Sequence, residues 1–204
     1  MPRDARGLIS NSPSAWSDRA SINDPSEAVR WSPKGQSERF THVLAVLDPK
    51  PGETLLDFGC GTGALAELLP ANVGYTGYDW AGGMIDRARH DHPTRRFSRG
   101  YPIATFDLVV CVGPFNLPHN WSKQQTWATL ETLWGQTGRM LAACLYAGDD
   151  GECLVYSEDE CGHSLRHLRG VGARTIVRHR PNDILLTLDR NSPPAELPSR
   201  PVGR

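Results

Sequence analysis

The chain has 204 residues, of which 39% are hydrophobic, and a formal net charge of −1 at pH 7. This length suits one domain with a sizeable core, and the near-neutral charge gives no basic footprint for nucleic acid. No apolar stretch is long enough to span a bilayer and the N-terminal residues form no apolar signal segment, so we expect a cytoplasmic protein. Five cysteines without a paired Cys-x-x-Cys spacing predict neither a disulfide framework nor a metal site.

The two ends of the chain differ in composition from the middle. Residues 1–28 are polar, without hydrophobic periodicity, and predict a flexible N-terminal segment, either a tail or a poorly fixed cap. Residues 191–204 contain four prolines and few apolar residues, which predicts a disordered tail. We therefore expect one folded domain over residues 29–190.

The first half of this domain alternates between helical and extended patterns. Gly35–Leu47 has apolar residues at helical spacing and ends before Pro49. A short apolar strand, Thr54–Phe58, follows and leads into a helix over Ala64–Leu69. Gly74–Asp79 is predicted as the next strand, and Gly83–His92 as the next helix, which Pro93 ends.

The second half of the domain continues the alternation and ends differently. We expect the strand Phe106–Val112 and then a long helical pattern over Trp121–Tyr146, which Gly135 and Gly138 weaken and can kink or divide. The strand Glu152–Ser157, the helix His163–Arg169 and the strands Arg174–His179 and Ile184–Asp189 follow. The turn-forming residues Pro181, Asn182 and Asp183 lie between the last two strands, which predicts an antiparallel hairpin. The whole order predicts a doubly wound α/β fold whose sheet is mostly parallel.

A glycine cluster between the first strand and its helix is the strongest indication of function. Leu55–Leu65 contains Gly59, Gly61 and Gly63, which let the backbone turn tightly and leave peptide groups open to a ligand. Ligands of such sheets bind at the carboxyl ends of the strands. Asp79 ends the next strand, where a carboxylate can accept hydrogen bonds from a ribose diol.

The same glycines also satisfy a dinucleotide fingerprint, Gly59-x-Gly61-x-x-Ala64. Asp57 argues against that alternative, because a carboxylate beside the loop repels a pyrophosphate. S-adenosylmethionine has no phosphate, and its methionine part carries an ammonium and a sulfonium, which a carboxylate stabilises. The loop therefore favours S-adenosylmethionine over a nicotinamide dinucleotide.

Three segments together resemble the class I S-adenosylmethionine-dependent methyltransferases. Leu55–Leu65 resembles their first motif, Gly77–Trp80 with Met84–Ala88 their second, and Phe106–Cys111 their fourth strand. The chain is also similar to small stand-alone methyltransferases of phages and bacteria. The resemblance implies a Rossmann-like, mostly parallel seven-stranded sheet with a C-terminal antiparallel hairpin.

The resemblance also implies roles for individual residues. The methionine part of the cofactor would be held by Asp57, Gly59, Gly61 and Gly63, and Phe58 and Cys60 of the same loop would also contact the cofactor. Asp79 would bind the ribose hydroxyls, while Trp80 and Met84 would flank the adenine. Tyr101 stands where many members have an acid for the adenine amino group, so adenine recognition would rest on stacking and backbone groups.

The acceptor is expected to enter after the fourth strand, at Gly113–His119. Asn116 is a candidate for holding the acceptor through its side-chain amide, and His119 a candidate general base. Both have structural alternatives, a loop-capping asparagine and an exposed loop histidine. Glu158 and Asp159 are considered as groups that would attract a cationic acceptor. Trp31, Trp121, Trp127 and Trp134 are either pocket walls for a flat substrate or core residues.

We therefore predict methyl transfer from S-adenosylmethionine to a small molecule or a modified base, with S-adenosylhomocysteine as second product. Three alternatives stay open: a non-catalytic cofactor-binding module or partner subunit, a nucleic-acid methyltransferase, and an NAD-dependent oxidoreductase. A nucleic-acid methyltransferase would need a basic rim, for which the candidates are Arg95, Arg96, Arg99, Arg166 and Arg169. The sequence specifies neither the methylated atom nor the oligomeric state.

Overall fold

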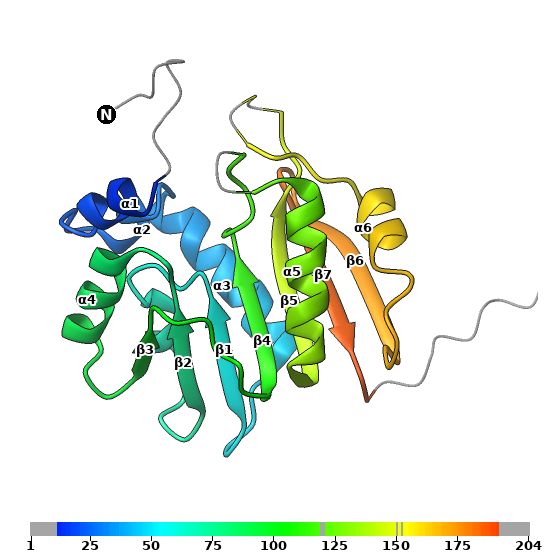
Figure 1. The fold of residues 1–204 in the computed structure, drawn as a ribbon, viewed down its shortest axis with the longest axis horizontal. Coiled ribbons are helices and arrows are strands. Elements are labelled where there is room, and N and C mark those ends of the chain that lie inside the picture. The colour runs from blue at the N-terminus through cyan, green and yellow to red at the C-terminus, as the bar shows by residue number, and fades with distance from the viewer. Residues whose placement is uncertain (1–11, 119–120, 150, 152, 192–204) are drawn as a thin grey trace, which may run out of the picture.

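The fold is a seven-stranded sheet with helices on both faces (Figure 1). The computed structural model describes residues 12–191 except 119, 120, 150 and 152. The strands are β1 Thr54–Phe58, β2 Gly74–Tyr78, β3 Arg96–Ser98, β4 Phe106–Val112, β5 Thr137–Tyr146, β6 Ala173–Arg180 and β7 Asp183–Asp189. The helices are α1 Pro13–Arg19, α2 Pro25–Ala28, α3 Pro33–Leu47, α4 Gly82–Asp91, α5 Lys123–Gly135 and α6 Glu158–Ser164, with a 3-10 helix, η1, at Ala64–Leu68.

The strand order is β3-β2-β1-β4-β5-β7-β6, and β7 alone runs against the other strands, since it pairs antiparallel with both β5 and β6. The doubly wound fold and its C-terminal hairpin are thus confirmed. The order reverses between β1 and β4, since the chain moves outward from β1 to β3 and then returns. In open α/β sheets a ligand binds in the crevice beyond the strand ends at such a reversal.

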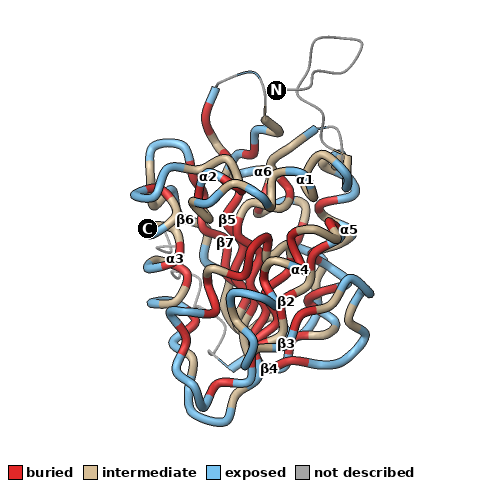
Figure 2. The backbone as a smooth tube through the Cα atoms, turned by 90° about the vertical axis from the view of Figure 1, so that its left-hand side faces the viewer, coloured by how far each residue is buried: buried red, intermediate tan, exposed pale blue. Residues whose placement is uncertain are grey.

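Two hydrophobic clusters cover the two faces of the sheet, and Figure 2 shows the buried residues concentrated along the central strands. Successive side chains of β4 point to opposite faces of the sheet. Leu108 and Val110 belong to the cluster under α3 and α4. Val109 and Cys111 belong to the cluster under α5 and α6. Because strand side chains alternate in direction, both faces of the central strands are buried.

The long helix predicted over Trp121–Tyr146 is wrong, because only its first half is helical. Helix α5 begins with a capping box at Ser122 and ends at Gly135. The rest is β5, which pairs with β4 on one side and β7 on the other. Seven of its ten residues are buried, and a strand buried on both faces shows no polar alternation from which the sequence would predict it.

Three other predictions about local structure need correction. The strand predicted at Glu152–Ser157 does not form in its described part. Leu154 and Tyr156 instead donate single backbone hydrogen bonds to Asn116 and Tyr146. Of the helix predicted over His163–Arg169, only His163 and Ser164 are helical. They end α6, which begins at Glu158 because the Ser157 hydroxyl caps it. The segment predicted as an α-helix after the glycine loop is the 3-10 helix η1.

The N-terminal segment differs from the flexible chain predicted for residues 1–28. Residues 12–28 form α1 and α2, whose N-caps are Ser12 and Asp24, each followed by a proline. The Arg87 guanidinium of α4 donates to the carbonyl oxygens of Ala20, Ile22 and Asn23. These bonds fix the segment along α4. Residues 1–11 and nearly all of the predicted C-terminal tail lie outside the described residues.

Candidate functional site

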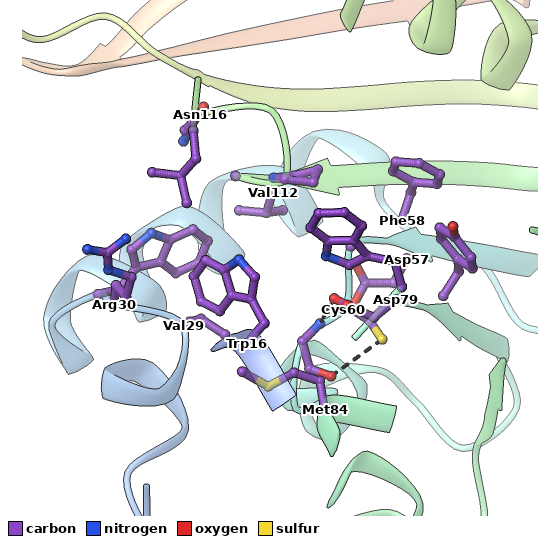
Figure 3. A pocket seen from close by; sticks show the side chains of 18 of the residues that line it. Trp16, Val29, Arg30, Asp57, Phe58, Cys60, Asp79, Met84, Val112 and Asn116 are labelled. Carbon is purple, nitrogen blue, oxygen red and sulfur yellow. Dashed lines mark hydrogen bonds between the residues drawn. The ribbon is translucent and has the colours of Figure 1, made fainter. Parts of the chain in front are cut away.

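A cavity of about 830 Å³ lies beyond the carboxyl ends of the central strands (Figure 3). The strand ends β1 and β2 contribute Asp57 and Asp79, and the loop after β4 contributes Asn116. The N-terminal residues Trp16, Val29 and Arg30 lie on the opposite side of the cavity from Asp57 in Figure 3. Its size is near the upper end of the roughly 300–1,000 Å³ of small-molecule sites.

The glycine loop after β1 adopts a conformation that only glycine takes readily. Gly59 and Gly61 have φ of +80° and +55°. A Cβ on Gly59 would lie 2.6 Å from the Pro114 Cβ, and one on Gly61 would lie 2.7 Å from the Val29 Cγ1. The loop is therefore held closely between the segment after β4 and the N-terminal segment.

Asp79 fixes the loop from the end of β2. Its Oδ2 accepts a hydrogen bond from the Gly61 backbone N–H at 2.9 Å, and its Oδ1 accepts one from Ala81 at 2.8 Å. Burial raises the pKa of Asp79, while the backbone donors of Ala81, Gly61 and Trp80 act in the opposite direction. The carboxylate lines the cavity with lone pairs left to accept from hydroxyl groups.

Asp57 lies deeper, at the end of β1. Its side chain is buried and its Oδ2 accepts a hydrogen bond from the Tyr75 hydroxyl at 2.8 Å. Burial raises the pKa of Asp57 to about 7, and the nearby Asp79 adds to this rise while the bond from Tyr75 opposes it. A cation placed in the cavity beside Asp57 would therefore favour its ionised form.

All the residues that the sequence predicted to bind the cofactor line this cavity except Gly63. Gly63 has φ of +79° and faces the Phe97 ring, so its missing side chain makes room for packing between the loop and β3. Met84 is buried, whereas Trp80 is 42% exposed at the edge. Tyr101 also lines the cavity, with its ring beside those of Phe58 and Tyr78.

Only some of the residues predicted for the acceptor side line the cavity. Asn116 lines the cavity, and its Oδ1 accepts a hydrogen bond from the Tyr146 backbone N–H at 3.1 Å. This bond is the structural role that the sequence left open for Asn116. His119 lies outside the described residues. Glu158 pairs with Arg178 and does not line the cavity.

The tryptophans divide in the same way. Trp31 and Trp121 line the cavity, whereas Trp127 and Trp134 contact the cluster under α5 and α6. The indole N–H of Trp134 donates to the Arg169 carbonyl, as expected for a buried tryptophan.

Several cavity residues could not be identified from the sequence. The Thr62 hydroxyl is buried at the loop and has no hydrogen-bond partner within the described residues. Val29 and Arg30 reach the site from the start of the predicted domain, directly after the segment that was predicted to be flexible. The position of Thr62 between two loop glycines was a sequence signal that would have indicated a cavity residue. Val29 and Arg30 have no such local signal, because long-range contacts position them.

The donors and acceptors around the loop fit S-adenosylmethionine. Asp79 can accept from ribose hydroxyls, Asp57 can stabilise a cation, and the unpartnered Thr62 hydroxyl can bind a polar group of the ligand. Throughout the described part of the chain, no cluster of three or more His, Cys, Asp or Glu side chains has metal-binding geometry. None of the helices described has the length and apolar character needed to cross a membrane.

Comparisons with known proteins agree with this description. Residues 56–130 match the model of a methyltransferase domain family. The fold is similar to the N-methyltransferase NodS from Bradyrhizobium japonicum in complex with S-adenosyl-L-homocysteine (17% identity, 89% of this chain and 100% of that chain, TM-score 0.67). It is also similar to magnesium protoporphyrin IX methyltransferase from Synechocystis with bound S-adenosylmethionine (18% identity, 83% and 85%, TM-score 0.63).

A third similar structure is a putative methyltransferase of Haloferax volcanii, solved in complex with the Trm112 methyltransferase activator. It shares 16% identity, with 88% of this chain and 99% of that chain covered and a TM-score of 0.64. No curated protein matches the sequence. At these identities the structural similarities establish the fold. The match to the methyltransferase domain family covers residues 56–130, which include the glycine loop and Asp79.

Proposed function

We propose that this chain, a class I methyltransferase that uses S-adenosylmethionine, methylates a small molecule bound beside the loop after β4. The observation that carries this proposal is the extent of the cavity. It continues from the cofactor residues Asp79 and Met84 to Trp121, Gln125 and Thr129, to which no cofactor role is assigned. This second part supplies the space that an acceptor needs.

The same observation argues against a non-catalytic binding module. Such a module would have a closed or filled crevice beside Asn116, whereas Asn116 lines the open cavity together with Leu117 and Trp121. The Oδ1 of Asn116 is engaged by Tyr146, and no hydrogen bond from its Nδ2 occurs among the described residues. That amide group is thus available to position an acceptor.

The arginines considered for a nucleic-acid site do not line the cavity. Arg95 donates to backbone carbonyls of the segment around Leu69 and Val73, and Arg99 pairs with Asp86. Arginines engaged in this way serve the fold and do not form a basic rim around the acceptor side. These contacts favour a small molecule over a nucleic acid as the acceptor.

The residues of the site contribute to methyl transfer chiefly by position and desolvation. The bound cofactor supplies an activated methyl group on a positively charged sulfur. Asp57 and Asp79 orient the cofactor from the strand ends, and the aromatic rings of Trp31 and Trp121 exclude water around the acceptor. His119, in the same loop as Asn116, is retained as the candidate general base for an acceptor that must lose a proton.

Calorimetric titration with S-adenosylhomocysteine, and in parallel with NAD, tests this function. We expect saturable binding of S-adenosylhomocysteine and none of NAD. Incubation with methyl-labelled S-adenosylmethionine and extracts of small metabolites should then give labelled small molecules, whereas labelling confined to added RNA or DNA would contradict the small-molecule acceptor. Binding of NAD in place of S-adenosylhomocysteine would contradict the function as a whole.

A further inference from the structure

Arg30 lies between two residues that contact the glycines at the ends of β1 and β4. On one side, Val29 approaches Gly61, whose added Cβ would be 2.7 Å from the Val29 Cγ1. On the other side, the Trp31 ring approaches Gly113, whose added Cβ would be 2.4 Å from the Trp31 Cζ2. The two contacts place Arg30 over the crevice between these strand ends, where it lines the cavity (Figure 3).

The backbone of Arg30 is held in a conformation that a long side chain seldom adopts. Its φ is +66°, in the left-handed region. The N–H of Arg30 donates to the Glu27 carbonyl at 3.0 Å, and that of Trp31 donates to the Ser26 carbonyl at 2.8 Å. Unfavourable backbone conformations persist where the surrounding structure imposes them, often at ligand sites. The fold therefore keeps an arginine at a position where glycine or asparagine would be less strained.

The guanidinium of Arg30 has neither an ion pair nor a hydrogen bond among the described residues, whereas the neighbouring cavity arginine has both. Arg39 pairs with Asp183 at 2.9 Å and stacks 4.7 Å from the centre of the Trp31 ring. Within the described residues, the acidic side chains that line the cavity are Asp57 and Asp79, which belong to the cofactor half. The acceptor half thus carries an unneutralised positive charge.

We infer that the acceptor is a flat molecule with an anionic group, and that Arg30 binds this group as a positioning residue. Guanidinium groups bind carboxylates through paired hydrogen bonds. The rings of Trp31, Phe40, Trp121 and Tyr146, all of which line the cavity, provide surfaces for a planar ligand body. This inference rests on the proposed function, because it concerns the acceptor of the same site.

The inference is tested by binding a panel of aromatic carboxylates and their neutral carboxamides, beginning with 4-hydroxybenzoate and 4-hydroxybenzamide, to protein saturated with S-adenosylhomocysteine. We expect carboxylates in the panel to bind about 10-fold or more tightly than their amides. Arg30→Asn should remove this preference, since asparagine tolerates the left-handed backbone but has no charge. Arg166→Gln is the matched control, because Arg166 is exposed and outside the cavity, and it should keep the preference.

Two kinds of result would overturn the inference. One concerns the acids, namely an equal affinity for acid and amide throughout the panel or a preference that survives in Arg30→Asn. The other is a loss of S-adenosylhomocysteine affinity in Arg30→Asn without a loss for methylthioadenosine, which would place the guanidinium on the carboxylate of the cofactor. A parent protein that fails to bind S-adenosylhomocysteine contradicts the proposed function itself, before any acid is added.

Discussion

The Asp79 carboxylate accepts a hydrogen bond from the backbone N–H of Gly61, so the end of β2 holds the loop that follows β1. The same carboxylate is the proposed ligand of the cofactor ribose. Asp79→Ala removes both interactions, and we expect the affinity for S-adenosylhomocysteine to fall about 10-fold or more, as a lost charged hydrogen bond of ~1.5–3 kcal/mol implies. Calorimetric titration measures this change. An unchanged dissociation constant would remove Asp79 from the cofactor site.

The raised pKa of Asp57 predicts a pH dependence of stability. In the unfolded chain an aspartate titrates at about 3.9, whereas in the folded protein the pKa of Asp57 is about 7. The folded state therefore holds a proton that the unfolded state releases between these values. The contribution of this group to the free energy of unfolding is fully present below about pH 4 and is lost as the pH rises through about 7.

Asp57→Asn isolates this contribution, because asparagine does not ionise and can still accept from the Tyr75 hydroxyl. We expect the melting temperature of the variant, relative to the parent, to increase between pH 5 and pH 8. Thermal unfolding of both proteins without ligand across this range provides the measurement. A difference that stays constant with pH would show that Asp57 has an ordinary pKa.

Gly59 should tolerate a side chain much less well than Gly52, although both have positive φ. An added Cβ at Gly52 meets nothing within 4 Å, whereas one at Gly59 meets Pro114 at 2.6 Å. We expect Gly52→Ala to lower the free energy of unfolding by about 1–2 kcal/mol through backbone strain alone. Gly59→Ala should lose a further ~1–3 kcal/mol through overpacking, together with S-adenosylhomocysteine binding. Urea denaturation compares the two, and equal losses would disprove the contact with Pro114.

Asn116 combines a structural bond with its proposed acceptor role, and two substitutions separate them. Asn116→Ala leaves the Tyr146 N–H without its acceptor, which should cost about 1–3 kcal/mol of stability. Asn116→Asp keeps an acceptor oxygen and should retain most of the stability, while it removes the amide donors. Denaturant titrations of both variants measure this, with S-adenosylhomocysteine affinity as the control that should not change. The structural role is refuted if alanine and aspartate cost the same.

Asp183 should be the most sensitive acidic residue outside the cofactor site. It is 2% exposed and pairs with Arg39 and Arg180. Asp183→Ala leaves partly buried guanidinium groups unpaired, and we expect a loss of about 3–5 kcal/mol in the free energy of unfolding. Lys34→Ala, which breaks an exposed ion pair with Glu38, should change it by less than ~1 kcal/mol. Comparable losses in the two variants would show that burial of the Asp183 pair adds nothing.

The residues proposed for the cofactor, apart from Gly63, line one cavity as a local stretch of the sequence predicts. Two consecutive strand–turn units contain these residues, which are Thr54–Phe58, the glycines that follow and Asp79. A short apolar strand that ends in glycines is typical of a ligand-binding loop. The hairpin of β6 and β7 was predicted for the same reason, since its turn lies between two β-rich segments.

The failures involve tertiary structure. Met140–Leu145 consists of residues that also favour helices, and only pairing with β4 and β7 makes it a strand. The N-caps Ser12 and Asp24 gave a local signal for α1 and α2, but so short a helix is stable only when it packs on α4. Arg30 could not be identified at all, because its place depends on contacts of its two neighbours with distant glycines.

The segment that carries Trp16 and Arg30 adds no strand to the sheet, and side-chain bonds to α4 anchor it. A molecule in which this segment has come loose, through proteolytic nicking or partial denaturation, would retain its sheet and most of its circular dichroism. It would nevertheless lack one wall of the cavity. Preparations of this protein therefore need to be judged by ligand occupancy, because spectroscopic measures of secondary structure would count inactive molecules as intact.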